Sequence, residues 1–459
     1  MKYIKYRLFI FIGILFFSCS AKKELTSHKP NWKDGLSVAQ WSKNANIYEV
    51  NVRQYSPEGT FNAFVKHLPR LKELGVDIIW IMPIHPIGVK KRKGELGSPY
   101  SSKNYKAVNP DLGTLQDFKN LVKKAHDLGM FVLLDWVANH SAFDNVWALE
   151  HPDWYTHDSL GQITHPQGTD WTDVADLNYD NPNMRAAMID AMKYWVKETN
   201  IDGYRCDVAG FVPNDFWKTA IDEIKTIKDV FMLAEWDDPK MHTEAGFDMS
   251  YGWGFHHMTN QIAKGEEMPE RIDAFMQEEK RYPASAIRMN FTTNHDENSW
   301  NGTVKERYGD AADVFAVLAF TLEGMPLLYS GQEANLNKRL SFFGKDTIDW
   351  SDLSKQKFFK KLLELKHENP ALWNGENGGA YRKIETDDPL VFAYARTKGE
   401  KEVVVILNFS DTSKNITLTK PVMQEAVFQY LFTAGSKKMS SLGENKFELP
   451  KYGYVVLSK

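Results

Sequence analysis

The sequence predicts an α/β chain whose main part is a (β/α)8 TIM barrel, followed by a small antiparallel β-sandwich domain. Amphipathic helical stretches that end in glycine alternate with short apolar runs, and about eight such runs occur before residue 370. After residue 373 the pattern changes to short alternating or apolar stretches between turn residues, which is typical of a sandwich.

Two helix–strand repeats open the barrel pattern. Residues 61–75 have apolar side chains at helical spacing and end in Gly75, and residues 115–129 repeat this and end in Gly129. Each is followed by an apolar run that reads as a buried strand. An open doubly wound sheet is the alternative, although no glycine-rich phosphate loop follows the first strand. The candidate strands lie near residues 47–52, 78–82, 131–136, 203–207, 230–235, 247–250, 286–292 and 326–330.

The connection between the third and fourth strands breaks this rhythm. Residues 141–180 are polar and aromatic, and they are too numerous for an ordinary loop, so we expect an excursion over one mouth of the barrel. The predicted domains are a catalytic barrel over 41–373, which includes this excursion, and the sandwich over 374–459.

The N-terminus indicates export. Residues 1–18 combine three basic residues with the apolar run "LFIFIGILFF", which is typical of a signal peptide. Cys19 follows Ser18, which resembles a lipobox and predicts lipidation at Cys19, with residues 19–40 as a tether. Plain signal cleavage beside an incidental cysteine is the alternative. We therefore expect an exported bacterial lipoprotein at the outer membrane or cell surface, and a periplasm-facing anchor stays open.

The net charge argues against one class of partner, and the position of the second cysteine indicates its role. The chain carries a formal charge of -4, and loss of the three basic residues of 1–18 would leave -7, which argues against nucleic acid as a partner. The second cysteine, Cys206, lies in an apolar strand and is expected to be a small core residue.

Acidic residues follow four predicted strands. In a barrel of this kind the carboxyl ends of the strands surround the active site. Such carboxylates can also be helix caps or structural ion pairs, but four at one barrel mouth point to chemistry. Carboxylates on both sides of a scissile bond suit glycosidic cleavage. The strand-end residues are Asp135, Asn139 and His140; Arg205 and Asp207; Glu235; and His295 and Asp296.

Arg205 and Asp207 stand two positions apart, so their side chains point the same way on a strand. We expect Arg205 to keep Asp207 ionised and to lower its pKa. Glu235 follows the apolar run "FMLA", and burial would raise its pKa, as a general acid requires. A structural ion pair is the alternative reading of Arg205 and Asp207.

The segments "DWVANH", "GYRCDVAGF", "AEW" and "FTTNHD" resemble, in order and spacing, the four signature regions of the α-amylase family, glycoside hydrolase family 13. The resemblance implies that Asp207 is the nucleophile, Glu235 the general acid/base and Asp296 the transition-state stabiliser. It also implies that His140, Arg205 and His295 bind the sugar that is cleaved, and that Tyr100 stacks on it. Asn104 stands where the family usually has an aspartate.

The resemblance also raises calcium as a cofactor. The excursion over 141–180 matches the family's domain B, here short. Asn139 and Asp176 match positions that hold calcium between barrel and domain B in many members, and such oxygen ligands suit that ion. Two recognised ligands do not make a site, and the family's calcium loop after the first strand is absent, so a chain without calcium stays open. No organic cofactor is implied.

Aromatic residues outside the strands are candidates for sugar stacking. Trp171, Trp253 and Trp300 lie in predicted loops, whereas Trp80 and Trp136 lie within strands and are expected in the core. His256 and His257 have no matching third ligand, so we expect them on a helix surface or cleft rim rather than on a metal.

The combined prediction is a membrane-anchored, retaining α-glucan hydrolase that cuts α-1,4 bonds of starch-like polymers or maltooligosaccharides from within. Gly210 and Phe211 replace the Lys-His of typical endo-acting α-amylases, and "DVAGF" with "VADLN" leans towards oligo-1,6-glucosidases. An oligo-α-glucosidase, a neopullulanase-type enzyme or a transglycosylase is therefore the alternative. A non-catalytic glycan-binding barrel is the alternative from another class.

Overall fold

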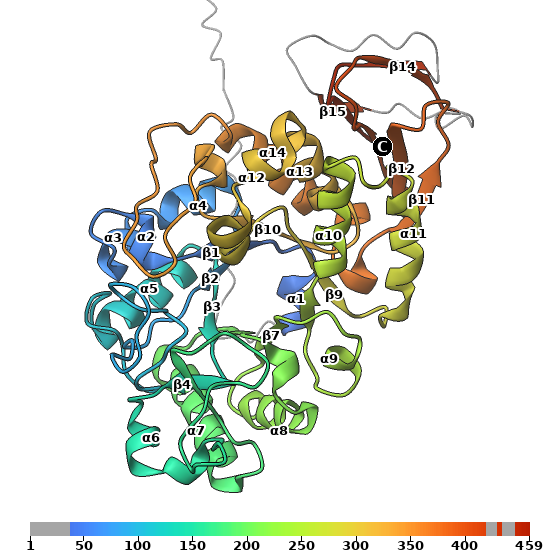
Figure 1. Cartoon of the computed structure of the whole chain (residues 1–459). Helices are drawn as coiled ribbons and strands as arrows, with labels where there is room; N and C mark the ends of the chain where they lie inside the picture. The colour runs from blue at the N-terminus through green and yellow to red at the C-terminus, as the bar shows by residue number, and fades with distance from the viewer. Residues whose placement is uncertain (1–36, 419–428, 434–445) are drawn as a thin grey trace, which may run out of the picture.

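The computed structural model describes residues 37–418, 429–433 and 446–459, and every structural statement below refers to these residues. The predicted signal peptide, Cys19 and most of the tether lie outside them. The central feature is a closed barrel of eight parallel strands in the order β1-β10-β9-β8-β7-β6-β3-β2 (Figure 1). The barrel strands are β1 (Ile47–Val50), β2 (Ile78–Ile81), β3 (Phe131–Trp136), β6 (Gly203–Cys206), β7 (Phe231–Ala234), β8 (Met249–Tyr251), β9 (Ile287–Asn290) and β10 (Met325–Tyr329).

These strands lie where the sequence predicts them, and the barrel prediction is confirmed. The alternative of an open sheet is wrong, because Ile47 of β1 pairs with Ile78 of β2 on one side and with Leu327 of β10 on the other. A ring closed in this way has no edge strand.

The helices surround this ring. The predicted helix over 61–75 is two helices, α3 and α4, with Pro69 in the first turn of α4, because proline lacks an N–H and fits only a helix start. None of the helices in the described ranges is both long and apolar enough to cross a membrane. They are α1 (Val38–Ser42), α2 (Val52–Tyr55), α3 (Phe61–Val65), α4 (Leu68–Leu74), α5 (Leu115–Asp127), α6 (Val146–Glu150), α7 (Pro182–Thr199), α8 (Asn214–Lys225), α9 (Lys240–Thr243), α10 (Trp253–Ala263), α11 (Arg271–Glu278), α12 (Val304–Tyr308), α13 (Ala312–Thr321) and α14 (Gln356–Glu368).

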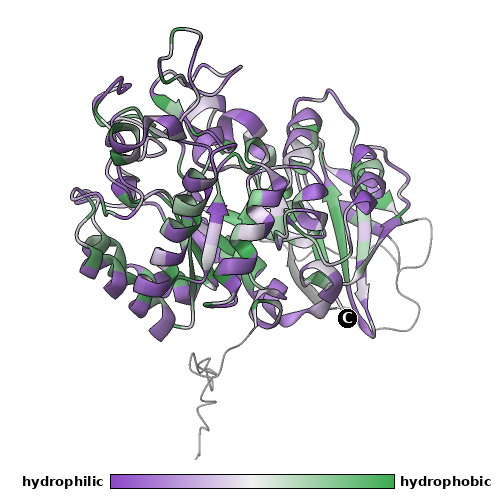
Figure 2. Cartoon of the chain, turned by 90° about the horizontal axis from the view of Figure 1, so that it is seen from below, coloured by the Kyte–Doolittle hydropathy of each residue, from purple (hydrophilic) through white to green (hydrophobic). Residues whose placement is uncertain are grey.

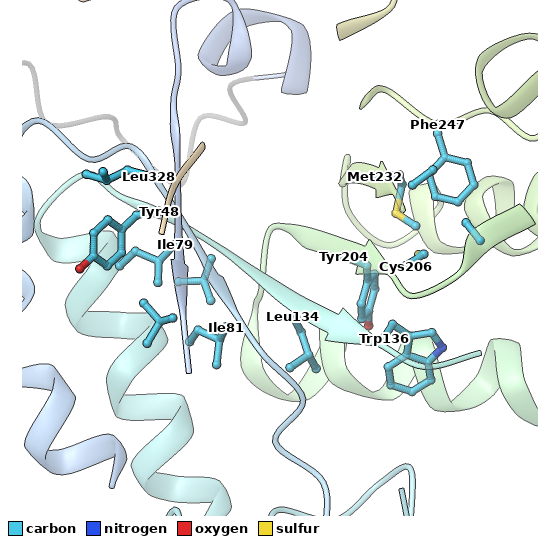
Figure 3. Close-up of a cluster of buried hydrophobic side chains, with 14 of the residues drawn as sticks. Tyr48, Ile79, Ile81, Leu134, Trp136, Tyr204, Cys206, Met232, Phe247 and Leu328 are labelled. Carbon is cyan, nitrogen blue, oxygen red and sulfur yellow. The ribbon is translucent and has the colours of Figure 1, made fainter. Parts of the chain in front are cut away.

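Alternation along each strand creates two buried layers. Tyr204 and Cys206 of β6 point outward into the apolar layer between strands and helices, where Cys206 lies among Trp136, Met232 and Phe247 (Figure 3). Cys206 is a free, fully buried cysteine, as expected for a core residue. Its neighbour Arg205 therefore points inward. Figure 2 shows the apolar strands enclosed by helices whose outer faces are hydrophilic.

Two further parts complete the fold. Between β3 and β6, the strands β4 (His140–Ala142) and β5 (Val174–Asp176) pair antiparallel at the base of the insertion that carries α6. The C-terminal part holds a five-stranded antiparallel sheet, β11-β12-β13-β17-β15, and the separate pair β14-β16. In Figure 1 these two parts lie at different ends of the barrel. The C-terminal strands are β11 (Ala380–Ile384), β12 (Val391–Lys398), β13 (Lys401–Asn408), β14 (Lys414–Thr417), β15 (Gln429–Thr433), β16 (Lys446–Leu449) and β17 (Tyr454–Ser458).

Candidate active site

A cavity of about 580 Å³ opens at the carboxyl ends of the barrel strands. Asp207 follows β6, Glu235 follows β7 and Asp296 follows β9, so three segments far apart in the sequence meet there. Asp207 and Glu235 are each 7% exposed, whereas the Asp296 side chain is 33% exposed. The cavity is lined by Lys93, Ser98, Tyr100, His140, Asp170, Trp171, Asp173, Val174, Asp207, Val208, Glu235, His295, Asp296, Trp300, Phe342 and Phe343.

Arg205 is the centre of the charged network beneath this cavity. Its Nη1 donates to Asp135 Oδ1 and to Asp207 Oδ1, both at 2.9 Å. Its Nη2 lies 2.9 Å from Glu235 Oε1. Arg205 and Asp135 are fully buried, and neither lines the cavity. One guanidinium thus serves three carboxylates rather than the single partner that the sequence suggested.

This sharing corrects the expected charge state of Asp207. Burial and the neighbouring Glu235 carboxylate raise the pKa of Asp207 well above its usual value, and Arg205 only partly opposes them. Burial likewise raises the pKa of Glu235, as the sequence predicts, again against the opposing effect of Arg205. Because the Glu235 carboxylate raises the pKa of Asp207, the two groups titrate as a pair.

Asp296 has the opposite character. Burial opposes its ionisation, but the His295 cation outweighs this effect and lowers the pKa of Asp296. His295 Nε2 lies 3.2 Å from Asp296 Oδ2 and 2.8 Å from the Tyr100 hydroxyl. The Tyr100 ring stacks on the His295 ring at a centroid distance of 5.4 Å, and its hydroxyl donates to Asp135 Oδ2.

His140 stands on the other side of the nucleophile candidate. Its Nε2 lies 3.9 Å from Asp207 Oδ2, and burial lowers the pKa of His140 to about 3. At neutral pH His140 is therefore uncharged, in contrast to His295.

Asn139 and Asp176, the predicted calcium ligands, lie on neighbouring segments. The main-chain N–H of Leu177 donates to the carbonyl of Asn139, and Asp176 pairs with His140 between β4 and β5. In the described part of the chain, no group of three or more His, Cys, Asp and Glu side chains is arranged to hold a metal ion. A calcium ion here would therefore need main-chain carbonyl or water oxygens in addition to Asn139 and Asp176.

The turn after β6 positions one donor. Val208 adopts φ +36°, which is unusual for a β-branched residue and costs about 1–3 kcal/mol. Its N–H donates to Glu235 Oε2 at 2.7 Å, so the strained turn holds the acid candidate. After Asp296, residues Glu297–Asn301 form a π-helical turn, a distortion that is frequent at functional sites.

Aromatic side chains stand at two sides of the cavity. Trp171 packs against Phe211, which in turn packs against Trp236, and Trp300 packs against Phe342. Trp171 and Trp300 line the cavity, as the sequence suggested, whereas Trp253 does not and packs against Phe291.

The remaining predictions for tryptophan and histidine residues are partly confirmed and partly wrong. Trp80 and Trp136 are fully buried, as expected. His257 is exposed, but His256 is buried and stacks on Phe291, where its Nε2 lies 3.0 Å from Glu297, so its expected surface position is wrong. His256 lies on the buried face of α10, together with Phe255, Met258 and Ile262.

Sequence reasoning missed several ionisable residues of this site, among them Lys93, Asp170 and Asp173 in the cavity lining and Glu49 beneath it. Glu49 is fully buried on β1, and its Oε1 contacts Nδ1 of His295, a residue 246 positions later. The only available signal was an acidic residue inside the apolar strand "IYEV". Phe342 and Phe343 were also missed, because they lie in a loop with no strand pattern.

Carboxylates, two histidines and aromatic rings around one barrel mouth, with a buried guanidinium beneath them, suit the hydrolysis of glycosidic bonds. Comparison with known families gives the finer class. The model of the α-amylase catalytic domain matches residues 31–169 and 151–386, and the model of the α-amylase SusG C-terminal domain matches residues 391–456. The chain therefore belongs to the α-amylase family of glycoside hydrolases.

Individual relatives agree. The chain is 31% identical over 397 residues to α-amylase MalA of Haloarcula japonica, with 82% of this chain and 57% of that protein covered. It thus spans little more than half of that relative. Among solved structures, the noncanonic maltogenic α-amylase AmyB of Thermotoga neapolitana has a TM-score of 0.80 at 32% identity, covering 90% of this chain and 98% of AmyB. An α-amylase of Lactobacillus plantarum has a TM-score of 0.80 at 31% identity, covering 91% and 99%.

Proposed function

We propose that this enzyme is a retaining hydrolase that cuts α-1,4-glucan chains from within. The observation that carries the proposal is that Asp207, Glu235 and Asp296 line one cavity with aromatic side chains at both of its sides. The proposal covers bond type and mode of attack, which go beyond membership of the family.

The charge states suit a double displacement. Asp207 attacks the anomeric carbon while Glu235 protonates the departing glycosidic oxygen, and a water activated by Glu235 then releases the glycosyl group. A proton shared by the buried pair fits an acid beside a nucleophile. Asp296, kept ionised by His295, stabilises the oxocarbenium-like transition state.

The position of the aromatic residues supports endo action. Trp171 and Phe211 come from the connections that follow β3 and β6, whereas Trp300 and Phe342 follow β9 and β10. In the ring of eight, β6 and β10 stand opposite each other. Sugar units can therefore stack on both sides of the acids, which suits the middle of a long chain more than its end.

Digestion of amylose by the purified chain from residue 20 tests this proposal. We expect iodine staining to fall much faster than reducing ends rise, and the first product to be the α-anomer by NMR. Glucose that appears from the first minutes while staining persists would show exo action and favour the oligosaccharide-cleaving alternative. A first-formed β-anomer would refute the double displacement.

Transglycosylation is the second candidate. It uses the same three carboxylates, and the apolar contacts among Trp171, Phe211 and Trp236 could favour a sugar over water as acceptor. Incubation with maltotriose separates the two, because a transglycosylase makes products longer than the substrate. Hydrolysis products alone would exclude it.

For location, we propose a lipid anchor at Cys19 that holds the enzyme on an exported membrane face. The support is the signal-like sequence of residues 1–18, together with the match of residues 391–456 to the SusG C-terminal domain. Cys19→Ala should move the enzyme from the membrane fraction to the soluble fraction, because a lipid chain contributes about 0.8 kcal/mol per buried CH₂. A variant that still sediments with membranes would refute the anchor.

A further inference from the structure

Glu49 lies on the inner side of the barrel near the carboxyl end of β1. It is 0% exposed, and its neighbours in the adjacent strands are Trp80 of β2 and Tyr329 of β10. An ionised carboxylate at such a position is costly unless another group needs it. None of the three catalytic assignments accounts for this residue.

The contacts of Glu49 are concentrated on one partner. Its Oε1 contacts Nδ1 of His295 and also lies 3.4 Å from the main-chain nitrogen of His295, which donates to it. Its Oε2 is buried and has no hydrogen-bond partner among the described residues. A carboxylate that only supported the fold would be expected to have both oxygens satisfied. This one faces a single imidazole ring.

The other nitrogen of that ring faces the cavity. His295 Nε2 lies 3.2 Å from Asp296 Oδ2 and 2.8 Å from the Tyr100 hydroxyl. A neutral imidazole has one N–H, and only the cation can donate from both nitrogens. With a carboxylate oxygen at each end of the ring, the cation satisfies both contacts.

We propose that Glu49 is a positioning residue that fixes the orientation of the His295 ring and keeps it doubly protonated, so that His295 presents a cation to Asp296. The effect on the reaction is indirect. Glu49 touches neither the cavity nor the substrate, and it acts on the transition-state stabiliser through His295.

The surrounding charges support a cationic ring. Burial lowers the pKa of His295, but Asp296 and Glu49 outweigh it and raise this pKa well above its usual value. Carboxyl groups also face the ring from two other strand ends, Asp135 through the Tyr100 hydroxyl and Glu235 across the cavity. Arg205 opposes them, but its guanidinium is held by Asp135 and Asp207. The rings of Trp80 and Phe342, which also face His295, carry no charge.

Glu49→Gln tests the proposal, since it keeps the shape and removes the charge. We expect kcat/KM on whichever α-glucan the wild type hydrolyses to fall about 10- to 100-fold, the range typical of residues that orient a functional ligand. Glu333→Gln is the matched control. Glu333 is also 0% exposed, but it pairs with Arg70 and the Tyr48 hydroxyl away from the cavity, so its loss should lower stability more than activity.

The decisive measurement is the titration of the His295 ring by NMR in the full folded chain, with its signal assigned from a His295→Asn variant. In the wild type and in Glu333→Gln we expect an imidazolium up to pH 8. In Glu49→Gln the midpoint should fall by at least one pH unit. A neutral wild-type ring at pH 7, or an unchanged midpoint in Glu49→Gln, would overturn the proposal. If Glu49→Gln does not fold, the wild-type titration still decides whether the His295 ring is charged.

Discussion

Arg205 sets much of the electrostatics of the site because this one buried guanidinium is shared among several acids. It contacts Asp135, Asp207 and Glu235, so it cannot keep all of them fully ionised. A site with an excess of carboxylates over cations retains protons, and the raised pKa values place them on Asp207 and Glu235, the pair that we propose for the nucleophilic and acid steps. Burial of these carboxyl groups lowers the stability of the folded protein, but it provides a group that can act as a general acid.

The first prediction concerns Asp207→Asn. A neutral amide cannot attack the anomeric carbon, so turnover should fall by at least about 10³-fold. The folded-state pKa of Asp207 is raised, so its carboxyl destabilises the fold as pH rises from its unfolded pKa, near 3.9, towards the folded value. The Tm of the variant should therefore equal or exceed that of the wild type at pH 7, and the difference should vanish near pH 4.

The control for this variant is Asp215→Asn, which removes an exposed carboxylate paired with Arg185. It should leave turnover and its pH dependence unchanged. Near-normal turnover in Asp207→Asn would contradict the nucleophile assignment, and a Tm well below the wild type at pH 7 would contradict the raised pKa.

The sequence is informative about the site residues that end a strand, because the barrel brings strand ends together. It thereby indicated the cavity position of Asp207, Glu235 and Asp296. It could not show Glu49, whose meaning depends on a contact with His295 across the closed ring. The predicted charge of Asp207 is wrong as well. The spacing shows that Arg205 lies close to Asp207, but it does not show that Asp135 and Glu235 contact the same guanidinium.

At the scale of elements, the loop after β6 shapes one wall of the site. A Cβ on Gly210 would stand 2.0 Å from the Trp236 ring, so glycine is required there to bring Phe211 and Trp236 together. Phe211 is 46% exposed and packs on Trp171. An exposed ring of this kind at the edge of the cavity offers a stacking face for sugar.

We predict that Phe211→Ala raises KM for maltoheptaose about 2- to 10-fold with a smaller change in kcat, because an aromatic contact contributes about 0.5–1.5 kcal/mol. Steady-state kinetics measure this effect. Leu160→Ala is the control, since Leu160 is 80% exposed on the insertion and does not line the cavity. An unchanged KM in Phe211→Ala would show that bound sugar does not reach this wall.

The insertion provides the prediction about calcium, which remains untested. If calcium bridges Asn139 and Asp176 with the help of main-chain oxygens and water, EDTA should lower the Tm and added Ca²⁺ should restore it, since a ligand at 100 times its Kd stabilises by about 2.7 kcal/mol. Asp176→Asn should have a lower Tm that EDTA no longer changes. A Tm that EDTA leaves unchanged in the wild type contradicts the prediction.

The positions of helices and strands are easier to predict from the sequence than the breaks within them. Most of the barrel strands come from apolar runs that can be read directly, whereas the sixth, β8, has only a weak signal around "GFDMS". The division of the first long helix at Pro69 depends on a single residue within an otherwise helical pattern. The burial of His256 depends on how α10 packs against Phe291, which no local pattern specifies.

At the scale of the whole molecule, the barrel and the C-terminal sheet share one apolar core. Tyr394, Val405 and Val456 of the sheet belong to the same buried cluster as the barrel's outer layer. The Thr321 hydroxyl of α13 lies 2.6 Å from the Tyr394 hydroxyl, and Phe409 packs on Phe315. The opposite face of the sheet forms a separate core with β14 and β16. Only one face of the C-terminal sheet therefore packs into the core that it shares with the barrel.

The last prediction follows from this shared core: the described parts of the chain should unfold as one cooperative unit. Val404 and Val405 offer a matched pair, because both are fully buried neighbours on β13 but face opposite sides, Val405 towards the barrel and Val404 towards β14 and β16. Calorimetry should show a single transition that either alanine substitution shifts down without splitting, with loss of activity on heating following the same curve. A second, earlier peak in Val404→Ala, with the activity curve unchanged, would show instead that the C-terminal sheet unfolds independently and that the contacts of Val405 with the barrel do not couple the two.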